Sequence, residues 1–401
     1  MVNVNEIFSD QAGRMSRSAI RECLKLTQQP DIISFAGGLP SPTSFPYDEI
    51  KEIAKEVIEN EGPSALQYGT TEGENVLRDE LVKRYLAEGC KVTRENFVIT
   101  TASQQSLDLL GKIFINPGDY IICELPSYLG GLNSFKVYGA KFIGIEPDES
   151  GMNPKVLEDT IVKLAEEGKK PKFIYLIPDF QNPAGITMPL QRRKDIIAVA
   201  QKYGILIVED SPYREIRFEG EHQTMLYALD DQGIVITLGT FSKSFCPGFR
   251  LGWIIANADV LEKFVQAKQT TDLCTSAYLQ KIAGYYLKKG YFEKNIGRIV
   301  AEYKSKRDNI IRCFEQYFPE GVTWTHPEGG LFLLVTLPEY IDSDELFYKA
   351  IEKKVAFVQG YTFFCDGSGR NTMRLNFSFA DEKIAEEGIK RLAEAIKSML
   401  K

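Results

Sequence analysis

Short apolar runs, rich in β-branched and aromatic residues, alternate with amphipathic segments between residues 97 and 239. The runs cover residues 97–100, 120–124, 141–146, 173–178, 204–210 and 233–239. Apolar runs this short, separated by helical patterns, are typical of βαβ units in a buried and mostly parallel sheet. The pattern therefore predicts a large α/β domain, with helices flanking the sheet, over residues 48–290.

The last third of the chain has a different pattern. Apolar residues between 296 and 318 recur at i, i+3 and i+4 spacing, which predicts a long amphipathic helix leading out of the large domain. Two strand candidates, GGLFLLVTL and NTMRLNFSF, and a closing helix candidate, KIAEEGIKRLAEAIKSML, come after it. They predict a smaller α+β domain over residues 291–401. We expect residues 1–47 to form an N-terminal segment that packs with the small domain and the active site.

Composition narrows the class of partner. The 401 residues exceed the usual size of one domain, and the net charge of -7 leaves no basic surplus for nucleic acid. The seven cysteines lie far apart without a C-x-x-C pair, and with only two histidines neither a disulfide framework nor a metal site is expected. No apolar run approaches the ~20 residues that cross a bilayer, and the first residues lack the apolar centre of a signal peptide. We expect a cytoplasmic protein that acts on small molecules, without a membrane partner.

Polar residues follow several of the predicted strands, at the edge where ligands bind to parallel sheets. Ser103 and Gln104 come after the first run and open a helix, whose N-terminal N–H groups can bind a phosphate. The same residues are equally typical of an ordinary helix cap. Asn182 lies in the sequence NPAG, which by itself predicts a turn. Asp210 ends the run 204–210, where a buried carboxylate needs a partner unless it lies at the surface, and Tyr213 follows three residues later.

A lysine, Lys243, follows the last of these runs between two serines. A lysine with an ordinary pKa of ~10.4 is a poor nucleophile at neutral pH, and most single lysines are solvated at the surface. Burial, or condensation with an aldehyde, changes that reactivity. Together, the phosphate-binding helix start, the carboxylate, the amide, the phenol, this lysine and Arg250 are the groups needed to hold a phosphorylated pyridine aldehyde. Pyridoxal phosphate accounts for all of them, whereas a nucleotide or a metal does not.

At these residues the sequence resembles the fold-type I, pyridoxal-phosphate-dependent aminotransferases of class I/II. It is most similar to the branch that includes 2-aminoadipate, kynurenine/aminoadipate and multi-substrate or aromatic aminotransferases. The resemblance extends over nearly the whole chain and rests on ISFAGGLPSPTSFP, LQYGTTEGENVLRDEL, TASQQSLDLLGKIFINPGDYIICELPSYLG, PDFQNPAGITM, VEDSPYREIRFEGE, TFSKSFCPGFRLGW and NTMRLNFSF. It implies a seven-stranded sheet in the large domain and a homodimer with shared active sites.

The resemblance also implies roles for the cofactor residues. Lys243 would form the Schiff base and act as the catalytic group, and Asp210 would pair with the ring nitrogen. Asn182 and Tyr213 would bond the phenolic oxygen of the ring, and Tyr128 would stack on it. The phosphate would be bound by Ser103, Gln104, Ser242 and Arg250, with help from Thr240 and from Tyr68 of the neighbouring subunit.

For the substrate, the resemblance implies that Arg374 clamps the α-carboxylate as a planar fork, beside Asn182 and Gly38. Arg21 is a candidate for a distal carboxylate, although a solvated helix arginine would read the same in the sequence. Two residues depart from the family pattern. Thr240 stands where serine is often found and keeps the hydroxyl, and Ala102 stands where glycine is frequent, which should be tolerated if φ there is negative.

The implied reaction is a ping-pong transamination from an L-amino acid, such as 2-aminoadipate, glutamate, an aromatic or a branched or aliphatic one, to a 2-oxo acid. We expect 2-oxoglutarate as the acceptor. A pyridoxal-phosphate-dependent β-lyase or decarboxylase on the same scaffold is an alternative, because the cofactor ligands do not decide which bond breaks. An aminotransferase-like transcription regulator is a remote alternative, disfavoured because the sequence FAGGLP already begins at Phe35. A catalytically inactive homologue is disfavoured because the cofactor set is intact.

Overall fold

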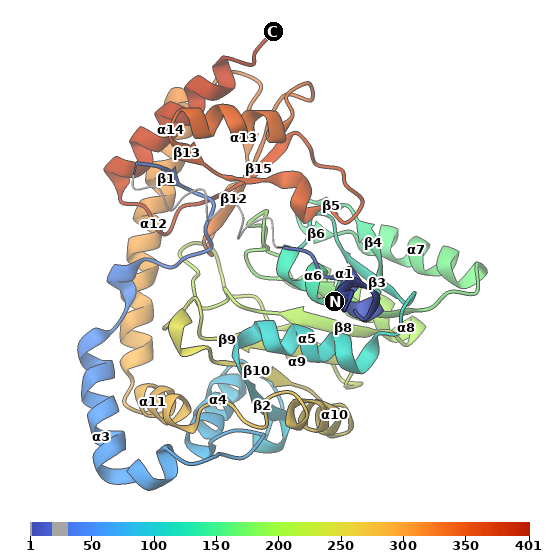
Figure 1. The fold of residues 1–401 in the computed structure, drawn as a ribbon, viewed down its shortest axis with the longest axis vertical. Coiled ribbons are helices and arrows are strands. Elements are labelled where there is room, and N and C mark those ends of the chain that lie inside the picture. The colour runs from blue at the N-terminus through green and yellow to red at the C-terminus, as the bar shows by residue number, and fades with distance from the viewer. Residues whose placement is uncertain (1, 18–30) are drawn as a thin grey trace.

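The large sheet has seven strands that are almost all parallel. A computed structural model describes residues 2–17 and 31–401 of the chain (Figure 1). The strands lie in the order β2-β10-β9-β8-β7-β3-β4, and only β10 runs antiparallel to its two neighbours. Their bounds are Phe97–Thr100 (β2), Tyr120–Glu124 (β3), Lys141–Ile145 (β4), Pro171–Leu176 (β7), Leu206–Asp210 (β8), Val235–Thr240 (β9) and Gly252–Ile255 (β10). All six predicted strands are therefore confirmed, and β10 is the strand that the sequence pattern did not reveal.

Both faces of this sheet are buried, which explains why its strands read as continuous apolar runs. On one face, residues such as Val98, Cys123 and Tyr175 pack with α5, α6 and α10. Alternate residues such as Ile122 and Ile174 pack on the other face with α7 and α8. The bounds of these helices are Ala102–Phe114 (α5), Leu129–Val137 (α6), Pro154–Glu166 (α7), Leu190–Tyr203 (α8) and Ala258–Gln269 (α10).

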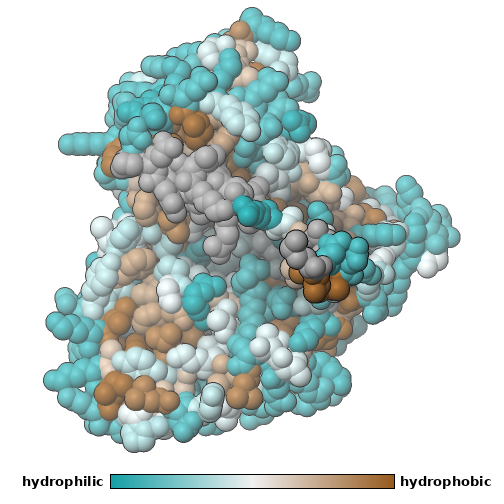
Figure 2. Space-filling model, in the orientation of Figure 1, coloured by the Kyte–Doolittle hydropathy of each residue, from teal (hydrophilic) through white to brown (hydrophobic). Residues whose placement is uncertain are grey.

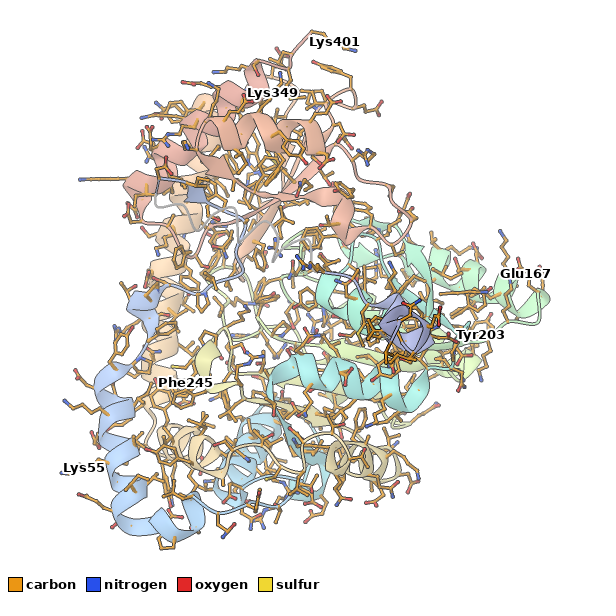
Figure 3. The ribbon with its side chains drawn as sticks, in the orientation of Figure 1. Lys55, Glu167, Tyr203, Phe245, Lys349 and Lys401 are labelled. Carbon is orange, nitrogen blue, oxygen red and sulfur yellow. The ribbon has the colours of Figure 1, made fainter. Side chains whose placement is uncertain are left out.

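A separate group of helices covers the sheet near β2 and β10. Helices α3 (Tyr47–Ala65) and α4 (Asn75–Ala87) both pack against α11 (Ala277–Lys288). Side chains fill the space between the layers throughout the molecule (Figure 3). In this region, for example, the ring of Phe245 stacks on Tyr286 with centroids 4.4 Å apart. Shorter elements connect the larger ones: η1 Val4–Glu6, α1 Asp10–Arg14, η2 Pro42–Ser44, η3 Arg94–Asn96, β5 Pro147–Asp148, β6 Gly151–Met152, α9 Leu226–Leu229 and η4 Pro247–Phe249.

The C-terminal part is built on an antiparallel sheet. The long helix α12 (Tyr291–Tyr317) leads from the large sheet to four strands in the order β11-β12-β15-β14 (Figure 1). These strands are Thr323–Trp324 (β11), Phe332–Thr336 (β12), Thr372–Asn376 (β15) and Val358–Gln359 (β14), and the helices nearby are α13 (Ser343–Glu352), η5 (Gly360–Phe363) and α14 (Glu382–Lys397). The predicted long helix, both predicted strands and the closing helix are thus present.

The segment before α3 contacts both parts of the fold: α1 packs against α6, where Arg14 Nε donates to the Val137 carbonyl at 3.1 Å, and β1 (Ile33–Ser34) joins the C-terminal part. Strand β1 pairs in parallel with β13 (Val355–Ala356), and the Phe35 amide donates to the Ala356 carbonyl at 2.8 Å. The domain boundaries that we placed at residues 47 and 290 stay predictions. Among residues 2–17 and 31–401, no helix is both long and apolar enough to cross a membrane.

Candidate active site

The polar residues that follow β7, β8 and β9 converge with residues from the N-terminal segment and from β15. Asp210 is the last residue of β8, and Lys243 lies three residues beyond the end of β9. The Lys243 Nζ donates to the carbonyl of Gly38, 205 residues earlier in the chain, at 2.6 Å. Residues far apart in sequence therefore meet at the carboxyl edge of the sheet, where a parallel sheet binds its ligands.

Asp210 carries a buried carboxylate, one oxygen of which accepts a hydrogen bond. Its Oδ2 accepts a hydrogen bond from the Tyr175 hydroxyl at 2.8 Å, whereas Oδ1 is buried and has no hydrogen-bond partner among the described residues. Burial raises the pKa of Asp210 to about 7, against the opposing effect of the Tyr175 hydrogen bond. A buried acceptor without a donor is costly, so this site favours a ligand with an N–H group, most strongly a cationic one. A protonated pyridine nitrogen meets that requirement.

Asn182, Tyr213 and Arg374 form one chain of hydrogen bonds. The Asn182 Nδ2 donates to the Tyr213 hydroxyl at 3.1 Å, and its Oδ1 accepts from Arg374 Nη1 at 3.0 Å. Arg374 Nη2 donates to the carbonyl of Ala36 at 2.8 Å, and the guanidinium lies 4.0 Å from the ring centroid of Phe332. Asn182, Tyr213 and Arg374 are all buried. The turn after β7 is therefore tied to β15 in the other sheet.

Lys243 has an unusually acidic ammonium group. Although the residue as a whole is only partly buried, desolvation, followed by the charges of Arg374 and Arg250, lowers the pKa of Lys243 to about 8. At neutral pH the free amine is thus far more populated than for an exposed lysine, since an ordinary pKa is ~10.4. The free amine is the form that attacks carbonyl carbon and that accepts protons.

The predicted phosphate ligands lie on two segments. The Thr240 hydroxyl accepts from the Ser242 amide at 3.1 Å, so both hydroxyls lie in the turn that leads to Lys243. Ser103 is the second residue of α5, whose N-terminal N–H groups lie at the same edge of the sheet. The exposed side chains of Gln104 and Arg250 donate instead to protein oxygens, those of Ser134 (2.7 Å) and Pro247 (3.2 Å).

Ala102 corrects one expectation. We expected alanine there to be tolerated if φ is negative, but φ of Ala102 is +61°. The residue thus adopts the left-handed conformation that favours glycine, and the buried start of α5 holds it there. Strand β10 lies tightly against this turn, since a Cβ on Gly252 would come within 2.7 Å of the Ala102 carbonyl carbon.

The remaining predicted residues are placed as follows. The ring of Tyr128 lies against the backbone of Gly130, where a Cβ would come 2.4 Å from Cζ of the tyrosine. Gly38 approaches Phe332 closely, because a Cβ there would lie 3.1 Å from its Cζ. Tyr68 is 79% exposed and lies apart from the residues above. Arg21 lies outside the described residues.

Two residues of the site were missed in the sequence. Tyr175 bonds Asp210, and Phe332 contacts Gly38 and Arg374 and lies edge-on to Tyr213 with ring centroids 5.9 Å apart. A hydroxyl in a buried, mostly apolar strand was a usable signal for Tyr175, because a buried tyrosine needs a polar partner. Phe332 stands in an apolar run like any core residue, so the pattern offered no signal for it.

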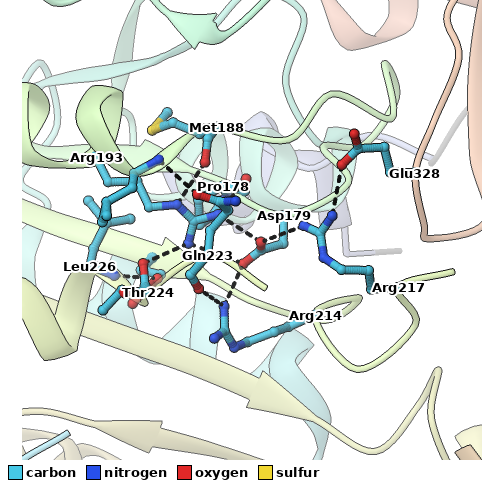
Figure 4. Close-up of polar contacts among 12 residues, drawn as sticks. Pro178, Asp179, Met188, Arg193, Arg214, Arg217, Gln223, Thr224, Leu226 and Glu328 are labelled. Carbon is cyan, nitrogen blue, oxygen red and sulfur yellow. Dashed lines mark hydrogen bonds and ion pairs between the residues drawn. The ribbon is translucent and has the colours of Figure 1, made fainter. Parts of the chain in front are cut away.

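A buried ion cluster holds the turn that carries Asn182. Asp179, which follows β7, accepts from Arg193 Nη2 at 2.7 Å and from Arg214 Nη1 at 3.2 Å, and Arg217 lies 3.7 Å away (Figure 4). Burial alone would raise the pKa of Asp179, but the guanidinium groups outweigh it and hold the pKa below its usual value. Arg193 also donates to the carbonyls of Pro178 and Met188, so the cluster fixes the backbone on both sides of the turn.

Comparison with known proteins agrees with this geometry. The family model for aminotransferase class I and II matches residues 40–394. The chain belongs to this aminotransferase family. This aminotransferase is 47% identical to aromatic-amino-acid aminotransferase 1 of Thermococcus litoralis, covering all of this chain and 96% of the relative. It is 39% identical to the 2-aminoadipate transaminase of Thermus thermophilus, over 99% of this chain and 98% of the relative.

A solved structure gives the same result for the fold. The kynurenine aminotransferase of Pyrococcus horikoshii superposes with a TM-score of 0.96 at 46% identity, covering 100% of this chain and 99% of that one. That structure holds PMP, the amine form of the cofactor, with kynurenine. The predictions of a fold-type I α/β aminotransferase and of pyridoxal phosphate as its cofactor are thereby confirmed.

Proposed function

We propose that this aminotransferase binds pyridoxal phosphate beyond the carboxyl ends of β7, β8 and β9 and moves the amino group of an L-amino acid to a 2-oxo acid. The observation that carries the placement is Oδ1 of Asp210, a buried acceptor for which residues 2–17 and 31–401 supply no donor. A protonated ring nitrogen would supply that donor. When bound, pyridoxal phosphate provides an aldehyde that condenses with amines and a ring that withdraws electrons.

Several side chains would hold the cofactor. Asn182 and Tyr213, already bonded to one another, would bond the ring oxygen, and Tyr128 would stack on the ring. The phosphate would be bound by Ser103, Gln104, Thr240, Ser242, Arg250 and, from the neighbouring subunit, Tyr68. Gln104 and Arg250 would exchange their bonds to Ser134 and Pro247 for bonds to phosphate oxygens, which are stronger because they are charge-assisted.

Lys243 would anchor the cofactor and then transfer the proton. Its amine, released when a substrate amine takes its place, would take the α-proton of the substrate. A pKa of about 8 suits this role, since a general base works best when its pKa lies near the working pH. The Lys243 Nζ already donates to the Gly38 carbonyl, which would steady the side chain.

Arg374 would bind the α-carboxylate. The guanidinium is buried, rests on the Phe332 ring and is oriented by Asn182 and by the Ala36 carbonyl. A planar fork fixed in this way can form two parallel bonds to a carboxylate, which a lysine cannot reproduce. Gly38 and Asn182 would line the same site. The α-carbon would thereby be held between Arg374 and Lys243.

For the amino donor we propose 2-aminoadipate, glutamate, aromatic and branched or aliphatic amino acids, with 2-oxoglutarate as acceptor. The support is the similarity to the aromatic-amino-acid and 2-aminoadipate enzymes and the Phe332 ring at the substrate side of the site. Arg21 stays a prediction for the distal carboxylate.

We further propose a cytoplasmic homodimer. Tyr68 is a large side chain left exposed, and so are Leu66 (73%) and Ile58 (42%) nearby in the chain. Figure 2 shows apolar residues gathered over the face that α3 and its neighbours form. An exposed apolar surface of this kind is typical of a protein interface.

The test is a single half-reaction. Enzyme carrying its cofactor is mixed with one amino acid and no oxo acid, and the 2-oxo acid and ammonia are measured. We expect one equivalent of 2-oxo acid per site and then arrest, with loss of the Schiff-base absorbance. Continued release of ammonia or pyruvate would identify the β-lyase alternative, and continued release of carbon dioxide the decarboxylase.

Lys243→Ala tests whether Lys243 is the catalytic residue. It should abolish turnover and the Schiff-base absorbance, because no other amine in the site can replace it. Lys268→Ala would not be a suitable comparison variant, because the buried Lys268 ammonium donates to Asp272 and Thr275 and its loss would disturb the fold. Undiminished turnover in Lys243→Ala would overturn the proposed role.

A further inference from the structure

Two cysteines from different parts of the fold meet beside the site. Cys123 lies in β3, next to the edge strand β4 of the large sheet, and Cys365 lies in the loop between η5 and β15 of the C-terminal part. Their sulfur atoms are 3.9 Å apart although 242 residues separate them in sequence. Neither takes part in the proposed reaction. A disulfide needs the sulfur atoms at about 2.05 Å, so the two would have to come ~1.9 Å closer.

The two cysteines differ in exposure. Cys123 is fully buried in β3, whereas Cys365 is only partly buried and is followed by exposed residues 366–368. Gly144, the cross-strand partner of Cys123, lies against Cys365, because a Cβ on it would come 3.1 Å from the Cys365 sulfur. The absence of a side chain at position 144 thus lets Cys365 lie close to β3 and β4. The exposed end of the loop is the side from which a small oxidant reaches Cys365.

The pair is also asymmetric in its chemistry. The Cys123 thiol donates to the Cys365 sulfur, and this hydrogen bond lowers the pKa of Cys365 and raises the pKa of Cys123. The thiolate is the form that reacts with oxidants. Cys365, the more accessible cysteine, is therefore also the more reactive one. The buried Cys123 lies beside it, as in pairs of an attacking and a resolving cysteine.

We propose that Cys123 and Cys365 form a reversible disulfide on exposure to a peroxide, which ties the C-terminal part to the large sheet. The Cys365 thiolate attacks hydrogen peroxide: an S–O bond forms, the O–O bond breaks and hydroxide leaves. Cys123 then attacks the resulting sulfenic sulfur: the S–S bond forms, the S–O bond breaks, and the leaving hydroxide takes the Cys123 proton to become water. The two thiols lose two electrons and the peroxide gains them.

The tie would form next to the cofactor-stacking residue. The Ser127 amide donates to the carbonyl of Phe363 at 2.8 Å, so the strand end that leads to Tyr128 already contacts the segment that leads to Cys365. Phe363 in turn lies 4.9 Å from the guanidinium of Arg374. A disulfide two residues beyond Phe363 would make this contact between the two parts of the fold covalent.

Peptide mapping tests the proposal directly. The folded, cofactor-loaded enzyme is treated with hydrogen peroxide, remaining thiols are blocked, and the protein is digested with trypsin without reduction. We expect a cross-linked species made of peptides 113–136 and 355–370, each of which contains one cysteine. Dithiothreitol should remove it, and the oxidised enzyme should unfold on the order of 5 °C higher than the reduced one.

The variants separate a specific pair from general oxidation. Cys365→Ser and Cys123→Ala should each abolish the cross-link and the shift in Tm, whereas Cys274→Ser, at another partly buried cysteine, should leave both unchanged. Mapping of the wild type does not depend on the variants folding. The proposal is overturned if Cys365 reaches the sulfinic acid without a cross-link, if both cysteines stay reduced, or if the cross-link forms only in unfolded protein.

Discussion

At the residue scale, the site depends on side chains that orient other side chains. Tyr175 has no part in the proposed reaction itself, but its hydroxyl donates a hydrogen bond to the Asp210 carboxylate. Hydrogen bonding to the charged form of an acid favours that form, and it opposes the burial that raises the pKa of Asp210. Tyr175 therefore keeps more of the carboxylate available for a cationic ring nitrogen.

This role predicts the effect of Tyr175→Phe. Removing a hydrogen bond to a charged group should weaken cofactor binding about tenfold, because Asp210 would be protonated up to a higher pH. The measurement is the Kd of pyridoxal phosphate, obtained by absorbance titration of the apoenzyme. Tyr203→Phe is the matched control. Tyr203 is the last residue of α8, and its hydroxyl donates to Glu158 of α7. Equal Kd values for wild type and Tyr175→Phe would contradict this role.

Sequence reasoning selected candidate residues with distinctive chemistry, whose roles stay predictions, and missed residues that contact them. Lys243, Asp210 and Asn182 were candidates only in combination, because a lone lysine is usually solvated and NPAG alone predicts a turn. The residues around Phe332 in the sequence are apolar, as they are for any core phenylalanine, and only the fold brings its ring against Arg374. Ala102 shows another limit, because nothing in the identity of an alanine indicates that its φ is positive.

At the scale of elements, periodicity identified strands that form βαβ units and missed the one that does not. Strand β10 has four residues and returns antiparallel beside β9 after residues 241–251, which include only the three-residue 3-10 helix η4. No α-helix lies in this described connection, so the alternation that marks the other strands is absent there. The two-residue strands β1 and β13 are likewise too short to have a period, and their pairing follows from tertiary packing alone.

The turn after β7 depends on the buried ion cluster, and this predicts a large effect of Asp179→Asn. Removing the carboxylate would leave Arg193, which is fully buried, without its charge partner. Breaking such a pair should lower the free energy of unfolding by about 3 kcal/mol, measured by urea denaturation of the apoenzyme. Asp148→Asn is the control. Asp148 of β5 pairs with Arg192, the neighbour of Arg193 in α8, but the Asp148 side chain is 43% exposed. Its loss should therefore lower the free energy of unfolding by under ~1 kcal/mol. Similar losses in both variants would show that the cluster does not stabilise the fold as described.

At the scale of the whole molecule, the homodimer proposal predicts complementation between two defective subunits. Tyr68→Phe should weaken phosphate binding in the neighbouring site, and Lys243→Ala should inactivate its own site. If Tyr68 acts across the interface, a mixed dimer has one site with both defects and one with neither. An equal mixture, refolded together at limiting cofactor, should recover about a quarter of wild-type activity. Activity no higher than the sum of the separate variants would place Tyr68 in its own subunit's site or outside any site.

The path of the chain between its two sheets has a mechanical consequence. Within residues 31–401, the chain passes between the large sheet and the C-terminal part in the segment between β1 and α3 and again through the unbroken helix α12, which at 27 residues spans about 40 Å. Helix α12 packs against α11 at the large sheet and against α14 in the C-terminal part. Because one continuous helix is shared in this way, a shift of the four-stranded sheet would be transmitted along α12 to the helices on the large sheet.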